Sequence, residues 1–323
     1  MNALISPLAL FIERRFGYPD MLTGMIGHPV MWFGRLIDSI EKRANRPDRS
    51  DRQRRYAGIV MLAILLAVAL VAALIVQQIT RAIPQGWIIE MLLATPFLAQ
   101  KELDRAVRAT AEALRTSLEA GREAVSHIVG RDPQALDEAG VARAAIETLA
   151  ESTSDGVVAP WFWLLLFGLP GIVLYKAINT ADSMVGHLNE RYWDFGWASA
   201  RLDDVANWIP ARLTAVLVTL ACFFTPFASP SKAWDTARRD ARKHDSPNAG
   251  WPEAAFAGAL GFSLGGPRSY DGEMVDLPAF GDGKRDLVAS DILRALQLYR
   301  KTLDVLLVLS VFIAVLRLVS PGV

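Results

Sequence analysis

The sequence predicts an all-α fold, that of a polytopic helical membrane protein with about four to six membrane helices. Some of these are expected to be broken or re-entrant, with cytoplasmic helical segments between them. Three observations lead to this prediction. Hydrophobic residues make up 52% of the 323 residues, long uncharged runs alternate with charged segments, and the 34 basic and 34 acidic residues cancel. A balanced charge argues against nucleic-acid binding, and the lone cysteine, Cys222, excludes an internal disulfide.

The first membrane helix is predicted over the uncharged run from Tyr56 to Thr80. Its 25 residues exceed the about 20 needed to cross a hydrocarbon core. Four further runs are candidate spans, with buried soluble helices as the alternative: 82–100, 156–175, 213–231 and 303–319. The uncharged stretches 21–34 and 254–267 are too short to span and predict buried or re-entrant segments.

The distribution of Lys and Arg predicts a multi-pass protein of the cell (inner) membrane with its N-terminus in the cytoplasm. Segment 35–55 holds eight basic residues against four acidic ones. With five alternating spans, the inside segments hold 28 of the 34 basic residues. We expect one membrane-embedded domain over 1–323, made of the segments 1–55, 56–100, 101–155, 156–231, 232–302 and 303–323.

Segment 101–155 has the spacing of amphipathic helices. One helix is predicted to end at Gly130, and a second to start at Asp132-Pro133 and run toward 152–156. Near its end Glu147, Glu151 and Asp155 recur every four residues and therefore share one helix face. Such a ladder suits Mg²⁺, which prefers carboxylate oxygens; a solvated acidic face is the alternative.

Segment 176–212 carries the densest polar pattern. A stripe begins at Lys176 and continues through Thr180, Ser183 and His187, with Asn179 and Asp182 beside it. Farther along, the pair Asp203-Asp204 stands between Arg201 and Arg212. Carboxylates beside arginines suit a metal and a phosphate together. An ordinary amphipathic helix with surface ion pairs explains the same pattern.

The segment 244–253 predicts a loop followed by a helix that begins after Pro252. Backbone N–H groups at that helix start could bind an anion. The chain has no G-x-x-x-x-G-K-[ST] motif, so ATP would not bind in a P-loop, and no Cys/His spacing typical of zinc. For each of the four histidines we favour a structural role over a role as a ligand.

Several long strings resemble the adenosylcobinamide-phosphate synthase family of cobalamin biosynthesis, the CobD/CbiB family of integral membrane proteins, over nearly the whole chain. They are G-Y-P (17–19), H-P-V (28–30), E-T-L-A-E-S-T-S-D-G-V-V-A-P (147–160), Y-K-A-I-N-T-A-D-S-M-V-G (175–186), F-G-W-A-S-A-R-L-D-D-V-A-N-W-I-P-A-R (195–212), D-S-P-N-A-G-W-P-E-A-A-F-A-G-A-L-G (245–261) and L-G-G-P (264–267). The chain departs from the family pattern at Glu13, Tyr18, Ser152 and His187, so no role is carried over to them.

The resemblance implies an ATP-dependent ligase that joins adenosylcobyric acid to 1-amino-2-propanol or its O-phosphate by an amide bond. Such chemistry needs acids for Mg²⁺ and basic groups for phosphate. Our own hypothesis assigns catalysis to Asp155, Asp182 and Asp204, and metal binding to Glu147, Glu151, Asp155, Asp203 and Asp204. It assigns substrate or phosphate binding to Lys176, Asn179, Arg201, Asn207, Arg212, His244, Ser246, Asn248 and Glu253.

Simple alternation of spans would place 176–212 outside, away from cytoplasmic ATP. Gly168-Leu169-Pro170-Gly171 interrupts the preceding apolar run, so we expect a broken helix there, with the polar stripe lining a cavity open to the cytoplasm. Expected partners are the bilayer, the two substrates, a second copy or other late-pathway membrane enzymes, and no nucleic acid. The alternatives are a transporter, in which broken helices are common, and a non-catalytic corrinoid-handling membrane protein.

Overall fold

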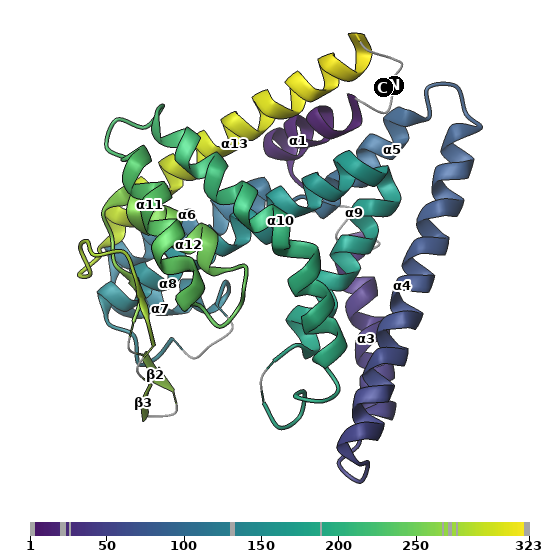
Figure 1. The fold of residues 1–323 in the computed structure, drawn as a ribbon, viewed down its shortest axis with the longest axis horizontal. Helices are drawn as coiled ribbons and strands as arrows, with labels where there is room; N and C mark the ends of the chain where they lie inside the picture. Colours follow the sequence, from purple (N-terminus) through teal and green to yellow (C-terminus); the bar gives the residue numbers. More distant parts are fainter. Residues whose placement is uncertain are drawn as a thin grey trace. The chain divides into compact units, whose positions relative to one another are not determined.

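The structure is a computed structural model that describes residues 4–19, 24–25, 27–129, 133–187, 189–266, 268–270, 273–275 and 277–319. Figure 1 shows a fold built almost wholly of helices. They are α1 (Ile5–Phe16), α3 (Pro29–Ala44), α4 (Asp51–Arg81), α5 (Trp87–Ala94), α6 (Gln100–Thr116), α7 (Leu118–Ser126), α8 (Glu138–Thr153), α9 (Ala159–Val185), α10 (Trp197–Cys222), α11 (Pro230–Asp240), α12 (Gly250–Leu260) and α13 (Ala289–Val319). The all-α prediction is confirmed.

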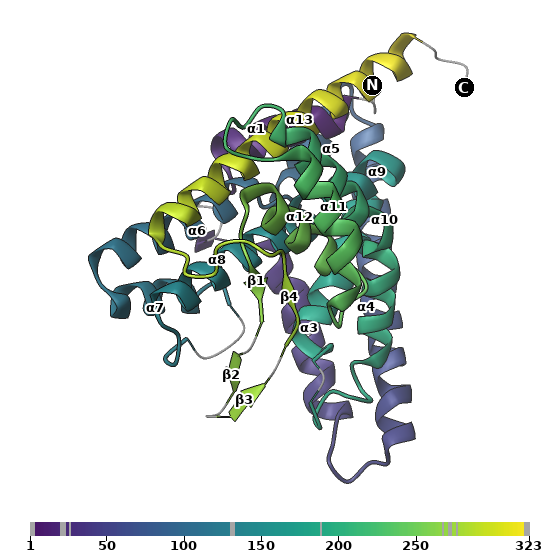
Figure 2. The ribbon, with the colours of Figure 1, turned by 60° about the vertical axis from the view of Figure 1, so that its left-hand side comes forward.

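Short turns and strands complete the description. Thr95–Phe97 and Ala241–Lys243 are 3-10 turns, and Ser154–Val158 is a π-helical turn between α8 and α9. Two antiparallel pairs of strands follow α12: β1 (Leu264–Gly265) with β4 (Ala279–Phe280), and β2 (Arg268–Tyr270) with β3 (Glu273–Val275). Figure 2 shows β1 and β4 beside α12, with β2 and β3 farther from that helix. In the first pair Gly265 lies opposite Ala279.

Four helical runs in the described residues are long and apolar enough to cross a membrane: α4, the continuous run Glu138–Val185, α10 and α13. Only 28% of the apolar window of α4 and of α13 is buried inside the protein. Such a large outward apolar surface is typical of helices that face lipid. The fold is therefore that of a polytopic helical membrane protein.

Helix α4 starts where its sequence signals a start. The Ser50 hydroxyl group accepts a hydrogen bond from the Gln53 N–H, and the Gln53 side chain accepts one from the Ser50 N–H. This reciprocal capping box satisfies two backbone donors that a helix end otherwise leaves without partners. The uncharged run from Tyr56 to Thr80 then lies wholly within α4, which confirms the first predicted span.

Helix α9 is broken where the sequence predicts it. Gly168 has φ 66° and ψ −151°, which is not a helical conformation, and Pro170 follows two residues later. Glycine adopts such angles without the steric cost that a Cβ imposes, and proline cannot continue the hydrogen-bond ladder behind it. The apolar run therefore consists of two helical pieces that meet at Gly168.

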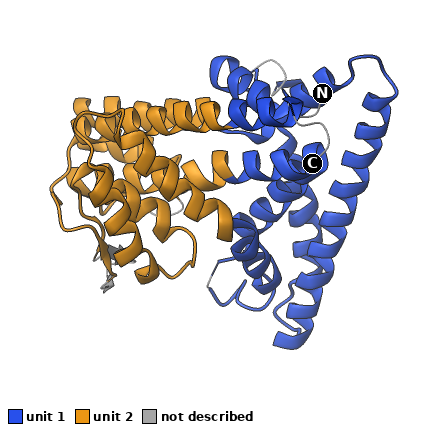
Figure 3. Ribbon diagram, turned by 45° about the horizontal axis from the view of Figure 1, so that its top comes forward, with its two compact units in different colours: residues 1–99, 159–207, 310–323 blue, residues 100–158, 208–309 orange. Residues whose placement is uncertain are grey.

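The chain forms two compact units, coloured separately in Figure 3. The first unit contains residues 1–99, 159–207 and 310–323, and the second contains 100–158 and 208–309. Inside the first unit, α4 packs against α3 and α9. Inside the second, α11 packs against α12, and α8 packs against α6 and α12.

Several predicted boundaries were wrong. The second helix of segment 101–155 begins at Glu138, because Asp137 accepts a hydrogen bond from the Gly140 N–H and caps it there, and 133–137 are not helical. The first predicted helix is divided at Ser117, which caps α7. Gly130 and Asp132 lie outside the described residues. Helix α12 begins at Gly250, two residues before Pro252, which lies in its first turn.

The predicted spans also change. The run 82–100 is not one helix, because it holds the short helix α5 and a 3-10 turn, and its last residue, Gln100, begins α6. The run 213–231 is divided, because α10 ends at Cys222 and α11 begins at Pro230. Helix α10 starts instead at Trp197, so its polar first half and its apolar second half form one helix. The run 303–319 is the second half of α13.

Candidate functional site

The polar side chains between α9 and α10 in the first unit form a cluster, here called the α9/α10 cluster. It consists of Tyr175, Asn179, Asp182, Ser199, Asp203 and Asn207. On α10, Ser199, Asp203 and Asn207 are four residues apart and therefore lie on one face. That face is buried although it is polar, and it faces Tyr175, Asn179 and Asp182 of α9, which lie beside the predicted polar stripe and not in it.

Hydrogen bonds connect the cluster. The Tyr175 hydroxyl group donates to Asn207 Oδ1 at 2.8 Å, and Asn207 Nδ2 donates to Asp203 Oδ2, also at 2.8 Å. The Asn179 side chain and the Asp182 carboxylate both act electrostatically on Asp203. Two acidic side chains therefore lie near each other, and the Asn207 amide group holds one of them.

Two polar atoms of the cluster have no hydrogen-bond partner within the described part of the chain. They are Oδ1 of Asp203, whose residue is only 8% exposed, and Oγ of Ser199, which is fully buried. A buried polar atom without a partner costs free energy. In a native structure this points to a bound ion, a water molecule or a catalytic role.

Lys176 supplies positive charge beside the cluster. Its Nζ donates to Asn179 Oδ1 at 3.0 Å, and its charge also acts on His28. His28 caps α3 through Nδ1, which accepts from the Val30 N–H, and it hydrogen-bonds the backbone at Pro96. Burial and the charge of Lys176 lower the pKa of His28 below its usual value. His28 is thus a satisfied structural residue, as the sequence predicts.

The loop between α9 and α10 is fastened to the loop between α3 and α4. Arg54 donates to the backbone carbonyls of Glu190 and Arg191, and Asn45 donates to that of Arg191 at 2.9 Å. Arg191 in turn binds Glu41 through two 3.0 Å hydrogen bonds, which raise the pKa of Arg191. The ends of α9 and α10 that carry the polar motifs therefore lie at the same end of the first unit as the basic segment 35–55.

The remaining predicted residues of the first unit lie on the surface of α10. Arg201 Nη1 is 3.7 Å from Asp204 Oδ2, and the Arg201 side chain is 69% exposed. An exposed pair of this kind contributes little to stability. Asp204 is adjacent in sequence to Asp203, but successive residues of a helix point in different directions. The structure therefore separates the buried Asp203 from the outer Arg201–Asp204 pair.

In the second unit the acidic ladder changes from an α-helix to a π-helical turn. Glu147 is buried and its Oε1 accepts a 2.7 Å hydrogen bond from the Gly265 N–H. Glu151 is exposed, and Asp155 lies in the π turn beside Ser154, whose buried hydroxyl group has no partner among the described residues. Turns of this kind recur at functional sites. No group of three or more metal-binding side chains is present in the described ranges, so the predicted metal role of the ladder stays a prediction.

The loop 244–249 brings together the five predicted binding residues of the second unit. Arg212 donates to Asn248 Oδ1 at 3.0 Å and to the Pro247 carbonyl at 3.2 Å. Its guanidinium group lies over the rings of Trp208 and Trp251, at 4.4 and 5.1 Å from their centroids. Residues 244–249 contain no regular element, which confirms the predicted loop.

Inside this loop the polar groups bind one another. His244 Nδ1 accepts from the Ser246 N–H, and Ser246 Oγ accepts from the N–H groups of Asn248 and Ala249. His244 Nε2 is 3.5 Å from Glu253 Oε1 on the first turn of α12. The loop is therefore held in one shape at the start of that helix.

Asp240 anchors the end of α11 to the segment after β4. Its buried carboxylate accepts from Arg239 at 2.7 and 2.8 Å, from Lys243 at 2.7 Å and from the Gly281 N–H at 2.8 Å. Burial alone would raise the pKa of Asp240, but these partners outweigh it and hold the pKa well below its usual value.

Sequence reasoning missed Tyr175, Ser199 and Gly265. Tyr175 was the expected start of a motif but not a member of the site. Ser199 was detectable, because it precedes Asp203 by the same four residues that separate Asp203 from Asn207. The role of Gly265 could not be detected from the sequence, because its contact with Glu147 joins positions 118 residues apart.

Comparisons with known proteins extend over nearly the whole chain. The family model described as "CobD/Cbib protein" matches residues 6–299. The chain is 49% identical over 310 residues to "Cobalamin biosynthesis protein CobD" of Brucella anthropi, covering 95% of each chain. It is 46% identical over 324 residues to the protein of that name in Rhodobacter capsulatus, covering 98% of this chain and 99% of the other. No solved structure matches.

Proposed function

This chain belongs to the CobD/CbiB protein family of cobalamin biosynthesis, and from that premise we propose that it is an ATP-dependent ligase of the membrane. It joins a carboxylate of adenosylcobyric acid to the amino group of 1-amino-2-propanol or its O-phosphate. The single observation that carries the catalytic part is the α9/α10 cluster, in which Asp203 is buried, lies beside Asp182 and has an oxygen atom without a partner.

A carboxylate does not react with an amine at a useful rate until it is activated. Transfer of the γ-phosphoryl group of ATP to the carboxylate gives an acyl phosphate and ADP. The amine then attacks the acyl carbon, the C–O bond to phosphate breaks, and the amine loses a proton. The protein has to position the reactants, stabilise charge and accept that proton.

The residues of the α9/α10 cluster fit these tasks. Asp203 offers oxygen ligands of the kind that Mg²⁺ prefers, and its Oδ1, which has no hydrogen-bond partner among the described residues, is an atom that such an ion would satisfy. When bound, Mg²⁺ would neutralise phosphate charge. Lys176, beside Asn179, supplies a point charge for a phosphate oxygen. Asp182 is the group that we assign to accept the proton of the amine.

The loop 244–249 supports binding of the substrates. Arg212 is held by Asn248 and lies over two indole rings, so its planar group is fixed in orientation. A fixed guanidinium group suits bidentate contacts with phosphate or carboxylate oxygens. The acids Glu147, Glu151 and Asp155 and the pair Arg201–Asp204 remain in the proposal with the roles that the sequence predicts.

The two fastened loops support a proposal for the side of the membrane. The segment 189–191 binds Asn45 and Arg54 of the basic segment 35–55. Positive residues beside a span favour the cytoplasm. We therefore propose that the N-terminal segment and the loop between α9 and α10 both face the cytoplasm, where ATP and the corrinoid are found, in the cell (inner) membrane.

An assay of the purified, detergent-solubilised full chain tests the proposal. The sample receives adenosylcobyric acid, aminopropanol or its phosphate, and Mg-ATP, and amide product and ADP are measured. Asp203→Asn and Asp182→Asn should lower turnover by about a hundredfold or more, whereas Asp38→Asn, which removes an exposed ion pair with Lys42, should not. Asp155→Asn and Asp204→Asn test the other assigned acids in the same assay.

Transport is the second candidate, because the break at Gly168 is a feature of transporter helices. Proteoliposomes separate the two functions. A transporter accumulates the corrinoid unchanged, whereas the ligase converts it to amide product with one ADP formed per bond. Uptake of unaltered corrinoid without ADP formation in a folded sample would replace the ligase with the transporter.

A further inference from the structure

Arg242 lies in the 3-10 turn Ala241–Lys243, between α11 and α12, among basic residues that serve the fold. Its neighbours Arg239 and Lys243 both bind the buried carboxylate of Asp240. Arg242 itself is exposed, and it has no hydrogen bond or ion pair within the described part of the chain. The fold therefore leaves the charge and the donors of Arg242 available to a ligand.

The turn that carries Arg242 lies against the loop that holds Arg212. A Cβ atom at Gly250 would lie 2.2 Å from the Ala241 carbonyl oxygen atom, so only glycine lets the start of α12 approach this turn so closely. The loop just before α12 holds Arg212, whose Nη1 donates to Asn248 Oδ1 at 3.0 Å. The charge of Arg242 acts on the Arg212 guanidinium group. Two positive charges, from α10 and from the turn after α11, therefore lie near each other at one loop.

Arg212 also keeps donors for a ligand. Its Nη1 donates to the Trp208 carbonyl and to Asn248 Oδ1, and its Nη2 donates to the Pro247 carbonyl. A guanidinium group has five N–H donors, so two remain, and no group of the described residues accepts from Nε. The rings of Trp208 and Trp251 hold the guanidinium plane in place. An anion can therefore approach the edge formed by Nε and Nη2 through paired donors.

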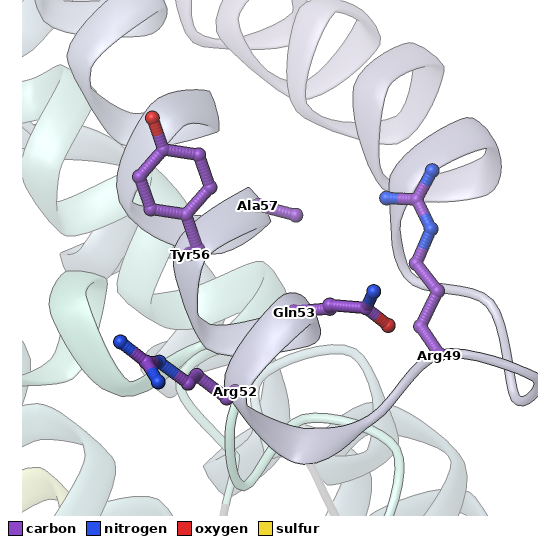
Figure 4. A pocket seen from close by; sticks show the side chains of 5 residues that line it. All are labelled: Arg49, Arg52, Gln53, Tyr56 and Ala57. Atoms are coloured by element: carbon purple, nitrogen blue, oxygen red, sulfur yellow. The ribbon is translucent and has the colours of Figure 1, made fainter.

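Two arginines in one neighbourhood do not by themselves bind one anion. The hollow at the start of α4 is lined by Arg49, Arg52, Gln53, Tyr56 and Ala57. Figure 4 shows the guanidinium groups of Arg49 and Arg52 on different sides of the helix, pointing away from each other. Those two charges do not meet at one point, whereas the charge of Arg242 reaches Arg212.

We propose that Arg212 and Arg242 together bind the phosphate group of a substrate, an assignment that rests on the proposed ligase function. A phosphate monoester carries a charge of about −1.5 to −2 at pH 7, so one such group can pair with both guanidinium groups. Bound between them, it replaces the repulsion of two like charges with attraction to a shared anion. The phosphate belongs either to ATP or to the O-phosphate of the amine, and both sources use the same chemistry.

Binding measured without turnover tests this site. Isothermal titration calorimetry of the full chain in detergent uses aminopropanol O-phosphate in one series and a non-hydrolysable ATP analogue with Mg²⁺ in another, and adenosylcobyric acid is left out so that no amide forms. Arg242→Gln should weaken the binding of one of these ligands about tenfold or more, because it removes a charge-assisted contact. Loss for the O-phosphate alone assigns the site to the amine, and loss for the analogue alone assigns it to ATP. Unchanged binding of both would overturn the proposal, as would a wild-type protein that binds neither.

The matched control is Arg238→Gln, which removes the same charge from an exposed position near the end of α11. It should retain wild-type binding, and an equal loss in both variants would assign the effect to net charge and overturn the proposal. Arg242→Lys keeps the charge without the paired donors, so it should recover part of the affinity. Thermal unfolding shows whether each variant is folded.

The titration and the ligase assay can fail separately. A chain that forms no amide product but binds a phosphorylated ligand through Arg242 would lose the proposed reaction and keep this site. A chain that forms the amide with wild-type affinities in Arg242→Gln would keep the reaction and lose the site.

Discussion

The Tyr175 hydroxyl group donates a 2.8 Å hydrogen bond to Oδ1 of Asn207, and both residues are almost fully buried. This bond joins α9 to α10 beside Asp182 and Asp203. Because Asn207 uses its oxygen for Tyr175, its amide nitrogen is directed to Asp203 Oδ2. Tyr175 therefore determines that the nitrogen atom of the Asn207 amide, and not its oxygen atom, faces the Asp203 carboxylate.

Replacing Tyr175 with Phe should reduce both stability and turnover. The substitution leaves Asn207 Oδ1 buried without its donor, which costs about 1–3 kcal/mol, and it allows the amide to turn. The matched control is Tyr299→Phe, which removes a 3.0 Å buried bond to the Gln100 carbonyl in the second unit. Thermal unfolding should show similar losses for both variants, and the ligase assay should show a loss for Tyr175→Phe alone. Equal turnover in the two would remove Tyr175 from the site.

Replacing Gly168 with Ala should destabilise the first unit. The added Cβ has space, since its nearest neighbour is Gln77 Nε2 at 3.5 Å, so the cost comes from the backbone conformation and is about 1–3 kcal/mol. Gly261→Ala is the comparison, because Gly261 has φ 68° and ψ 41°, a left-handed conformation that costs other residues less. Thermal unfolding in detergent measures both. A Gly168→Ala protein as stable as the wild type would show that the helix can run straight.

The break at Gly168 could be predicted because glycine and proline interrupt helices by local rules, whatever the rest of the fold does. The buried face of α10 could be predicted in part, since Asp203 and Asn207 share a helical spacing. The start of α10 at Trp197 was missed because a search for uncharged runs excludes Arg201 and the two acids after it. The partners of Tyr175 and Glu147 could not be predicted, because they depend on tertiary packing between distant segments.

His28 should make the protein less stable as the pH falls from 7 toward 5. Its pKa in the folded protein lies below the usual 6.5, so the unfolded chain binds the proton more readily. The stability that the neutral imidazole contributes is complete above about pH 6.5 and declines as the pH falls below it. In His28→Asn, whose side chain can still cap α3, the unfolding temperature should depend less on pH across this range. The control His127→Asn, at an exposed position, should keep the wild-type slope.

Asp240 should produce a second loss at lower pH. Its folded-state pKa lies below the usual 3.8, so its contribution is complete above about pH 4 and is lost as the pH falls through the lowered value. Asp240→Asn should cost about 2–3 kcal/mol at neutral pH, because Arg239 and Lys243 lose a buried charged partner. The variant should also lose less stability than the wild type when the pH falls below about 4. A variant with wild-type stability at pH 7 would contradict this account of the anchor.

Single cysteines should report the same side of the membrane for the two fastened loops. We expect Glu190→Cys and Asp48→Cys, each in a Cys222→Ser background, to resist an impermeant thiol reagent in intact cells. Both should react once the membrane is opened. Each position lies in an exposed part of its loop. Labelling of Glu190→Cys but not Asp48→Cys in intact cells would contradict the shared location, and labelling of both would reverse the proposed orientation.

The interruption at Gly168 also bears on the order in which the nascent chain enters the bilayer. Between the π-helical turn and Gly168 the apolar piece Ala159–Phe167 has nine residues, roughly 14 Å of helix, so the apolar residues of α9 before the break do not by themselves cover a hydrocarbon core of about 30 Å. An insertion machinery that selects whole spans would recognise this segment inefficiently as a membrane helix. Helix α4, which packs against α9, is synthesised earlier and offers a surface on which the short piece can settle. Biogenesis of α9 is therefore expected to depend on α4 already being in the membrane.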